Sequence, residues 1–153
     1  RAFKEALPPI FPDRFDENGE FEVPKTLIFA KMDSHADDII NMVREEFNEG
    51  NDFCKKITYK IEEDPKSVLN RFRNSWAPRI AVTVDMIATG TDVKPLEVLL
   101  FMRDVKSTNY FEQMKGRGTR TIKFDDLLKV TRTAKHTKTL ERLAWSSENG
   151  CSR

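Results

Sequence analysis

The chain has 153 residues, which suits one domain with or without appendages. Its 26 Lys and Arg against 25 Asp and Glu give a formal net charge of +1, which argues against a protein that holds nucleic acid by overall charge alone. Eleven Phe and two Trp supply enough apolar bulk for a core, which argues against wholesale disorder.

No apolar run approaches the roughly 20 residues that a bilayer requires, so we expect no membrane partner. The chain begins with Arg1 and no apolar stretch behind it resembles a signal peptide, so we expect a piece of a longer protein. Cys54 and Cys151 lie far apart and outside any paired motif, which favours a reducing, cytoplasmic location. His35 and His136 are isolated, and the sequence predicts no metal site.

Charge is unevenly distributed along the chain. Residues 103–142 carry eleven Lys or Arg against five Asp or Glu, a net of +6, whereas residues 1–102 carry a net of −5. Two interpretations remain open at this point: a basic face that meets phosphates, or a solvated surface on which like charges cluster by chance.

Residues 1–24 are expected to form a lead-in without regular structure. Pro8, Pro9 and Pro12 argue against a continuous helix there, because proline lacks the amide hydrogen that a helix needs. Regular structure is therefore expected to begin at Lys25.

Strands and helices are expected to alternate after that point. Residues 26–30 form a short apolar run typical of a strand buried on both faces. A helix should follow, with a capping box at residues 34–37 and a stop at Gly50. Asp64 as cap and Pro65 in the first turn predict the start of a second helix.

The other predicted elements are strands at residues 56–60, 79–84 and 97–102, and a third helix that begins near Ser107. This alternation predicts an α/β fold, with a parallel β-sheet and helices on both of its faces. In such sheets the functional residues gather at the carboxyl ends of the strands.

One stretch with chemical potential is residues 82–92, where a strand ends in a tight turn of small residues. Gly90 would let the backbone approach a ligand closely, and Asp92 could accept hydrogen bonds from hydroxyl groups. Taken alone, the pattern is equally explained by an acidic residue that caps a helix.

The other stretch is residues 113–120, where Arg117 and Arg120 are separated by a glycine and a threonine. Guanidinium groups suit phosphate oxygens because they are planar, permanently charged and bidentate. Gln113 lies one helical turn before Arg117, so both can face one side. The alternative is a basic helix end that interacts with its own carbonyl dipoles.

Together and in this order, the two stretches resemble motifs five and six of the superfamily-two helicases and translocases. Residues 85–92 resemble motif five, residues 113–120 resemble motif six as Gln-x-x-Gly-Arg-x-x-Arg, and residues 26–31 resemble motif four. Over residues 24–122 the chain is similar, more narrowly, to the motor (R) subunit of type I restriction-modification enzymes. The last residues, 140–153, resemble nothing expected in that family.

The resemblance implies a second RecA-like domain, in which ATP lies between this domain and a first one. Arg120 would be the arginine finger and Arg117 a second phosphate contact. Gln113 would organise the contact near the γ-phosphate. Gly90 and Asp92 would approach the nucleotide, with Asp92 at the ribose.

The resemblance also implies contacts to the DNA backbone, which carry little sequence information. The residues implied are Phe29, Ala30, Lys31, Thr83 and Asp85. In many relatives a threonine precedes the aspartate of motif five, but here the position holds a valine, so a hydroxyl contact from it is not expected.

The chain carries no phosphate loop of the form Gly-x-x-x-x-Gly-Lys-Ser/Thr. In the family, ATP and Mg²⁺ are held mainly by the first RecA-like domain, so we expect neither to be bound by this chain alone and no catalysis by it in isolation. The partners implied are double-stranded DNA, the first RecA-like domain of the same chain, and the methylation and specificity subunits of the restriction complex.

The resemblance suggests a lead-in at residues 1–24, a RecA-like helicase C-terminal domain at residues 25–122, and a partly mobile C-terminal extension at residues 123–153. Two alternatives remain open. The chain could be a non-enzymatic nucleic-acid-binding or assembly module that uses its basic C-terminal part. It could also be a flavodoxin-like or response-regulator-like domain with Asp85 as acceptor, although residues 31–33 fit that pattern poorly.

Overall fold

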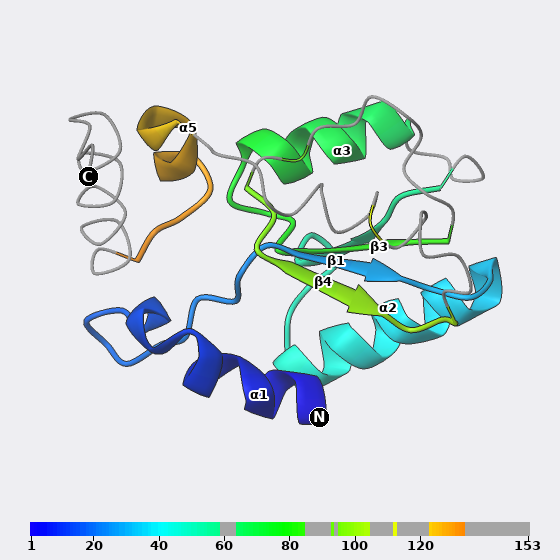
Figure 1. The fold of residues 1–153 in the computed structure, drawn as a ribbon, viewed down its shortest axis with the longest axis horizontal. Helices are drawn as coiled ribbons and strands as arrows, with labels where there is room; N and C mark the ends of the chain where they lie inside the picture. The colour runs from blue at the N-terminus through cyan, green and yellow to red at the C-terminus, as the bar shows by residue number, and fades with distance from the viewer. Residues whose placement is uncertain (59–63, 85–92, 94, 105–111, 113–122, 134–153) are drawn as a thin grey trace.

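The computed structural model of the chain describes residues 1–58, 64–84, 93, 95–104, 112 and 123–133. Among these residues, no helix has both the length and the apolar character that crossing a bilayer requires. Figure 1 shows the arrangement of a central sheet between helices.

The sheet has four parallel strands in the order β2-β3-β1-β4. They are β1 (Thr26–Phe29), β2 (Cys54–Lys56), β3 (Ile80–Thr83) and β4 (Val98–Phe101). Strand β1 lies between β3 and β4, and Phe29 is level with both Thr83 and Phe101. The ends of these three strands therefore form one edge.

Two apolar clusters cover the two faces of this sheet. The residues of β1 alternate between them: Ile28 joins the cluster that contains Ile39 of α2, and Leu27 joins the cluster that contains Phe72 of α3. All four residues of β1 and of β3 are buried. The predicted α/β fold, with a parallel sheet covered on both faces, is confirmed, and Figure 1 shows α1 and α2 on one side and α3 on the other.

Helix α2 (Asp33–Phe47) forms where the periodicity predicts it, and Ala36, Ile39 and Ile40 are its buried stripe. Its predicted ends are wrong in detail. The capping residue is Met32, without a side-chain hydrogen bond, so the expected capping box does not form. Asn48 adopts the left-handed conformation (φ 55°) that ends the helix before Gly50, because asparagine tolerates this region better than most residues.

Helix α3 (Pro65–Asn74) starts as predicted. The Asp64 side chain accepts a hydrogen bond from Lys66 N at 3.3 Å, and Pro65 occupies the first position, where no amide hydrogen is needed. Val68, Leu69 and Phe72 form its buried face.

The expectation that regular structure begins at Lys25 is wrong. Residues Ala2–Ile10 form helix α1, and Pro12–Arg14 form the 3-10 turn η1. Pro8 and Pro9 fall in the last turn of α1, so the loss of their amide hydrogens interrupts only the end of the ladder, and Phe11 N still donates to Leu7 O at 2.9 Å. Leu7 is buried against the core, which stabilises the short helix.

The remaining elements differ modestly from the predicted ones. Strand β2 begins two residues earlier than predicted and ends at Lys56, and residues 59–60 of the predicted range lie outside the described residues. Strands β3 and β4 fall within their predicted ranges. The helix predicted near Ser107 lies outside the described residues. A short helix, α5 (Phe124–Leu128), follows later in the chain.

Candidate nucleotide and DNA interface

The described part of the candidate site is the carboxyl edge of β1, β3 and β4. Ala30 N donates to Thr83 O at 2.8 Å, and Met102 N donates to Phe29 O at 2.9 Å, so backbone hydrogen bonds join the three chain segments where the strands end. The structure thus brings together four residues predicted from the sequence: Phe29, Ala30, Lys31 and Thr83.

Burial separates these four residues into two groups. Phe29, Ala30 and Thr83 are at most 2% exposed, whereas Lys31 is exposed. The Phe29 ring stacks on Phe101 at 5.1 Å with an interplanar angle of 8°. Phe29 and Thr83 therefore support the edge from inside, and the Lys31 side chain is the one of the four that can reach a phosphate.

The edge around Lys31 is partly apolar. Met32 and Met102 follow the ends of β1 and β4 and are 51% and 39% exposed. Lys31 N donates to Nδ1 of His35 at 3.2 Å, so the first turn of α2 fixes the backbone where Lys31 projects.

A second lysine at this edge forms ion pairs within the protein. Lys56, at the end of β2, lies 2.8 Å from Asp37 and 3.1 Å from Asp33 at the start of α2. Burial alone would lower its pKa, but the two carboxylates outweigh that cost and raise the pKa of Lys56. Its charge is therefore held within the protein, in contrast to that of Lys31.

The structure adds one residue that the sequence did not single out. Arg103 follows β4, and its Nη1 donates to Val84 O, just beyond β3, at 2.8 Å. This bond crosses the end of β1, which lies between the two strands. A sequence signal exists in retrospect, because Arg103 comes directly after the predicted strand at residues 97–102.

The other predicted site residues lie outside the described residues: Asp85, Gly90, Asp92, Gln113, Arg117 and Arg120. Their assignments remain predictions. The segment of residues 85–92 follows Val84 directly in the chain, and Val84 lies at the described edge.

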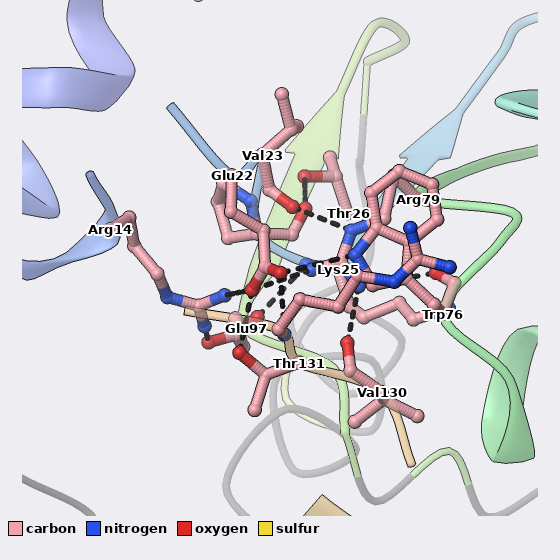
Figure 2. Close-up of polar contacts among 12 residues, drawn as sticks. Arg14, Glu22, Val23, Lys25, Thr26, Trp76, Arg79, Glu97, Val130 and Thr131 are labelled. Atoms are coloured by element: carbon pink, nitrogen blue, oxygen red, sulfur yellow. Dashed lines mark hydrogen bonds and ion pairs between the residues drawn. The ribbon is translucent and has the colours of Figure 1, made fainter. Parts of the chain in front are cut away.

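The opposite, amino end of the sheet carries a polar cluster with a buried centre, shown in Figure 2. This amino-end cluster comprises Arg14, Glu22, Lys25, Trp76, Arg79, Glu97, Thr131 and Arg132. Three of these residues immediately precede a strand: Lys25 precedes β1, Arg79 precedes β3 and Glu97 precedes β4.

Glu22 is the centre of this cluster. Its Oε1 accepts from Arg14 Nη1 at 2.9 Å and from Thr131 Oγ1 at 2.6 Å, and its Oε2 accepts from Trp76 Nε1 at 3.0 Å and from Arg132 N at 2.7 Å. Burial would raise the pKa of Glu22, but the hydrogen bond from Thr131 and the charge of Arg79 outweigh it, and the pKa is lowered. Glu22 is therefore a buried, ionised carboxylate.

The buried basic side chains of the cluster are strongly desolvated. Arg79 donates to the carbonyl oxygens of Val23, Trp76 and Val130. Lys25 Nζ donates to Ser75 O at 2.7 Å and to Pro78 O at 2.5 Å, and lies 4.9 Å from the centre of the Phe72 ring. Burial, with the nearby charge of Arg79, lowers the pKa of Lys25 to about 6.

The arrangement offers no evident metal site, because the described residues contain no group of three or more His, Cys, Asp or Glu that could hold an ion. Cys54 is buried, and burial raises the pKa of its thiol to about 12. That pKa keeps the sulfur protonated and unreactive, in the manner of a structural cysteine.

No family model matches the chain. It is 34% identical over 127 residues to the type I restriction enzyme EcoKI endonuclease subunit of Escherichia coli K12, a match that covers 78% of this chain and 11% of that protein. It is 30% identical over 102 residues to the EcoAI endonuclease subunit of Escherichia coli, which covers 63% of this chain and 12% of that protein.

A solved structure is also similar. It is a fragment of a putative HsdR subunit of a type I restriction enzyme from Vibrio vulnificus YJ016, with a TM-score of 0.62 and 27% identity. The similarity covers 84% of this chain and 25% of that one. The chain thus spans about a tenth of the length of its curated relatives. Sequence and fold agree that this chain is homologous to a segment of the endonuclease subunits of type I restriction enzymes.

Proposed function

We propose that the chain is the second RecA-like domain of an ATP-dependent DNA translocase, within the endonuclease subunit of a type I restriction enzyme. The single observation that supports this most is the order β3-β1-β4 in a parallel sheet. Strands β3 and β4 flank β1 and end level with it. The two helicase-like segments, residues 85–92 and 113–120, come after β3 and β4 in the chain, and these two strands end at the same edge.

In this proposal Arg120 is the arginine finger and Arg117 a second contact to the phosphates of ATP. Both act on a nucleotide held by the first RecA-like domain, together with Mg²⁺, across the interdomain cleft. Gln113 orders the contact near the γ-phosphate, and Gly90 and Asp92 approach the nucleotide, with Asp92 at the ribose. Catalysis requires groups from both sides of the cleft, so this chain alone hydrolyses no ATP and cuts no DNA.

The DNA contact is assigned to the same edge. Lys31 offers the exposed charge, whereas the buried Phe29, Ala30 and Thr83 contribute the rigid backbone from which it projects. Asp85 belongs to the same contact in the proposal. Such contacts follow the phosphates of duplex DNA and leave sequence recognition to the specificity subunit. The complex with the methylation and specificity subunits would be cytoplasmic.

The proposal is tested by Arg120→Ala in the full-length subunit. Loss of an arginine finger costs a factor of roughly a thousand or more in turnover, so DNA-stimulated ATP hydrolysis should disappear while the circular dichroism spectrum stays unchanged. Arg73→Ala is the matched control, because Arg73 lies in the last turn of α3, away from the carboxyl edge.

Persistent ATP turnover in the Arg120→Ala variant would refute the finger assignment. A wild-type full-length subunit that binds duplex DNA without hydrolysing ATP would refute the motor itself. That second outcome would favour the non-enzymatic nucleic-acid-binding module.

A further inference from the structure

Arg132 differs from the other arginines of the amino-end cluster because its side chain reaches solvent. Arg14 and Arg79 are 1% exposed, whereas Arg132 is exposed. The central carbon of its guanidinium group lies 4.1 Å from the centre of the Trp76 ring, which is close enough for a cation–π contact. Within the part of the chain that the structure describes, no carboxylate forms a salt bridge with this guanidinium group.

The buried Glu22 orders both halves of this stack. Its Oε2 accepts a hydrogen bond from Trp76 Nε1 at 3.0 Å and another from the backbone N of Arg132 at 2.7 Å. The residues on either side, Thr131 and Thr133, are only 6% and 1% exposed, so the backbone is anchored where the Arg132 side chain projects. A guanidinium group that is ordered in advance loses little conformational entropy when it binds an anion.

The amino-end cluster also has a positive charge that its own carboxylates do not balance. Three arginines lie here with two glutamates: Arg14, Arg79, Arg132, Glu22 and Glu97. Lys25 adds little charge at pH 7, because burial, with the charge of Arg79, lowers its pKa to about 6. The unbalanced charge meets solvent at Arg132, and an anion bound there would compensate it.

We propose that Arg132 binds a backbone phosphate of duplex DNA at the amino end of the sheet. This inference rests on the proposed function, which supplies duplex DNA as the anion. The face of the guanidinium group stacks on Trp76, and its N–H groups lie in the plane of the group, where two of them can donate to two phosphate oxygens. The contact is separate from that of Lys31, which follows the carboxyl end of β1, and it carries no sequence information.

The test is the binding of a labelled duplex by the full-length subunit. Arg132→Ala should weaken binding about tenfold at every sequence and reduce the slope of log affinity against log salt by about 1. Arg132→Lys keeps the charge but not the planar group, so it should preserve the slope and weaken binding by about threefold. Lys129→Ala is the matched control and should bind as the wild type does, because it removes an equal charge nearby that is already paired with Asp126 at 2.8 Å.

Three outcomes would overturn the contact. The first is equal affinity of Arg132→Ala and Lys129→Ala for the duplex. The second is a loss of affinity in Arg132→Ala with the wild-type salt slope, which would show that the stack on Trp76 serves only the fold. The third is binding of inorganic phosphate, measured by calorimetry, that Arg132→Ala abolishes without any change in duplex affinity, which would assign the site to a free phosphate.

The same variants separate this contact from the proposed function. If Arg132→Ala loses affinity and salt slope as expected but the wild-type subunit hydrolyses no ATP, the motor fails while the phosphate contact stands. If ATP hydrolysis is intact and Arg132→Ala binds the duplex as Lys129→Ala does, the contact fails while the motor stands.

Discussion

The two ends of the sheet use charged residues in opposite ways. At the amino end, Glu22, Lys25 and Arg79 are buried and contact one another or backbone carbonyls. At the carboxyl end, Lys31 is exposed and Arg103 holds a single carbonyl. The comparison indicates that these three ionisable groups at the amino end are enclosed by partners within the fold, whereas at the carboxyl end Lys31 leaves its charge exposed next to the paired Lys56.

A buried charge is stable only where hydrogen bonds and opposite charges compensate for the loss of water around it. Glu22 accepts four hydrogen bonds, from segments of the chain that are widely separated in sequence. Removing it leaves Arg79 without the carboxylate beside it and leaves Arg14 with Glu97 alone, and the side chains of Arg14 and Arg79 are only 1% exposed. Removal of Glu22 is therefore expected to destabilise the fold strongly, whereas an exposed lysine can be replaced at little structural cost.

The largest expected effect is that of Glu22→Gln. The substitution should lower the free energy of unfolding of the chain by roughly 3–5 kcal/mol, because the buried Arg79 loses the carboxylate beside it and Arg14 keeps only Glu97. Urea unfolding measures this, and Glu20→Gln, at an exposed neighbouring position, is the control. Thr131→Val removes only one of the four donors and should cost about 1 kcal/mol, which keeps the comparison measurable if Glu22→Gln does not fold. Equal stabilities of the two Gln variants would contradict the contrast between the ends.

The next effect is a dependence of stability on pH. The pKa of Lys25 falls from its ordinary 10.5 to about 6 on folding, so between these values the unfolded chain binds more protons than the folded one. The free energy of unfolding should therefore rise with pH, by about 1 kcal/mol per unit, and the full burial penalty should apply below about pH 6. Lys25→Met keeps the apolar stem over Phe72 and should flatten this slope.

The dependence of the free energy of unfolding on pH should be measured between pH 6.5 and 8.5. The lowered pKa of Glu22 acts only under its ordinary 4.5, and the raised pKa of Cys54 reduces stability only above its ordinary 9. The desolvated Arg14 and Arg79, whose pKa values fall to about 10, act above that window. A wild-type slope that Lys25→Met leaves unchanged would assign the dependence to another group.

The smallest expected effect lies at the carboxyl end. Lys31→Ala should leave the midpoint of urea unfolding unchanged, since the side chain is exposed. In the full-length subunit it should weaken duplex binding slightly at every sequence and reduce the slope of log affinity against log salt by about 1. Lys4→Ala, on α1, is the control. A loss of stability without any change in the salt slope would show that Lys31 serves the fold instead.

Much of the fold was predictable because apolar runs determine it. The runs that became β1 and β3 are uninterrupted and buried on both faces, and the Asp64–Pro65 pair is a strong local signal for the start of α3. The sequence does not predict helix α1, because Pro8 and Pro9 argue against a helix, although proline in the last turn of a short helix removes few bonds.

The amino-end cluster was not predictable in the same way. A charged residue in a sequence is usually a surface residue, and nothing local shows that Glu22 meets Thr131, since the two lie 109 positions apart. One signal was present: Lys25, Arg79 and Glu97 each stand just before an apolar strand. At the carboxyl edge the sequence identified Lys31. It could not show that Phe29 and Thr83 are buried while Lys31 is exposed, because burial depends on the tertiary structure.

Glu22 also connects two stretches of chain that are far apart in sequence. Through Thr131 and the backbone of Arg132, it joins the stretch of chain that leads into β1 to a stretch that follows α5. These contacts lie near Lys25, at the amino end of β1 (Figure 2), whereas Lys31 follows the carboxyl end of that strand. Loss of these contacts would release the stretch after α5 from the chain that leads into β1, and it would leave the hydrogen bond between Lys31 and His35 in place.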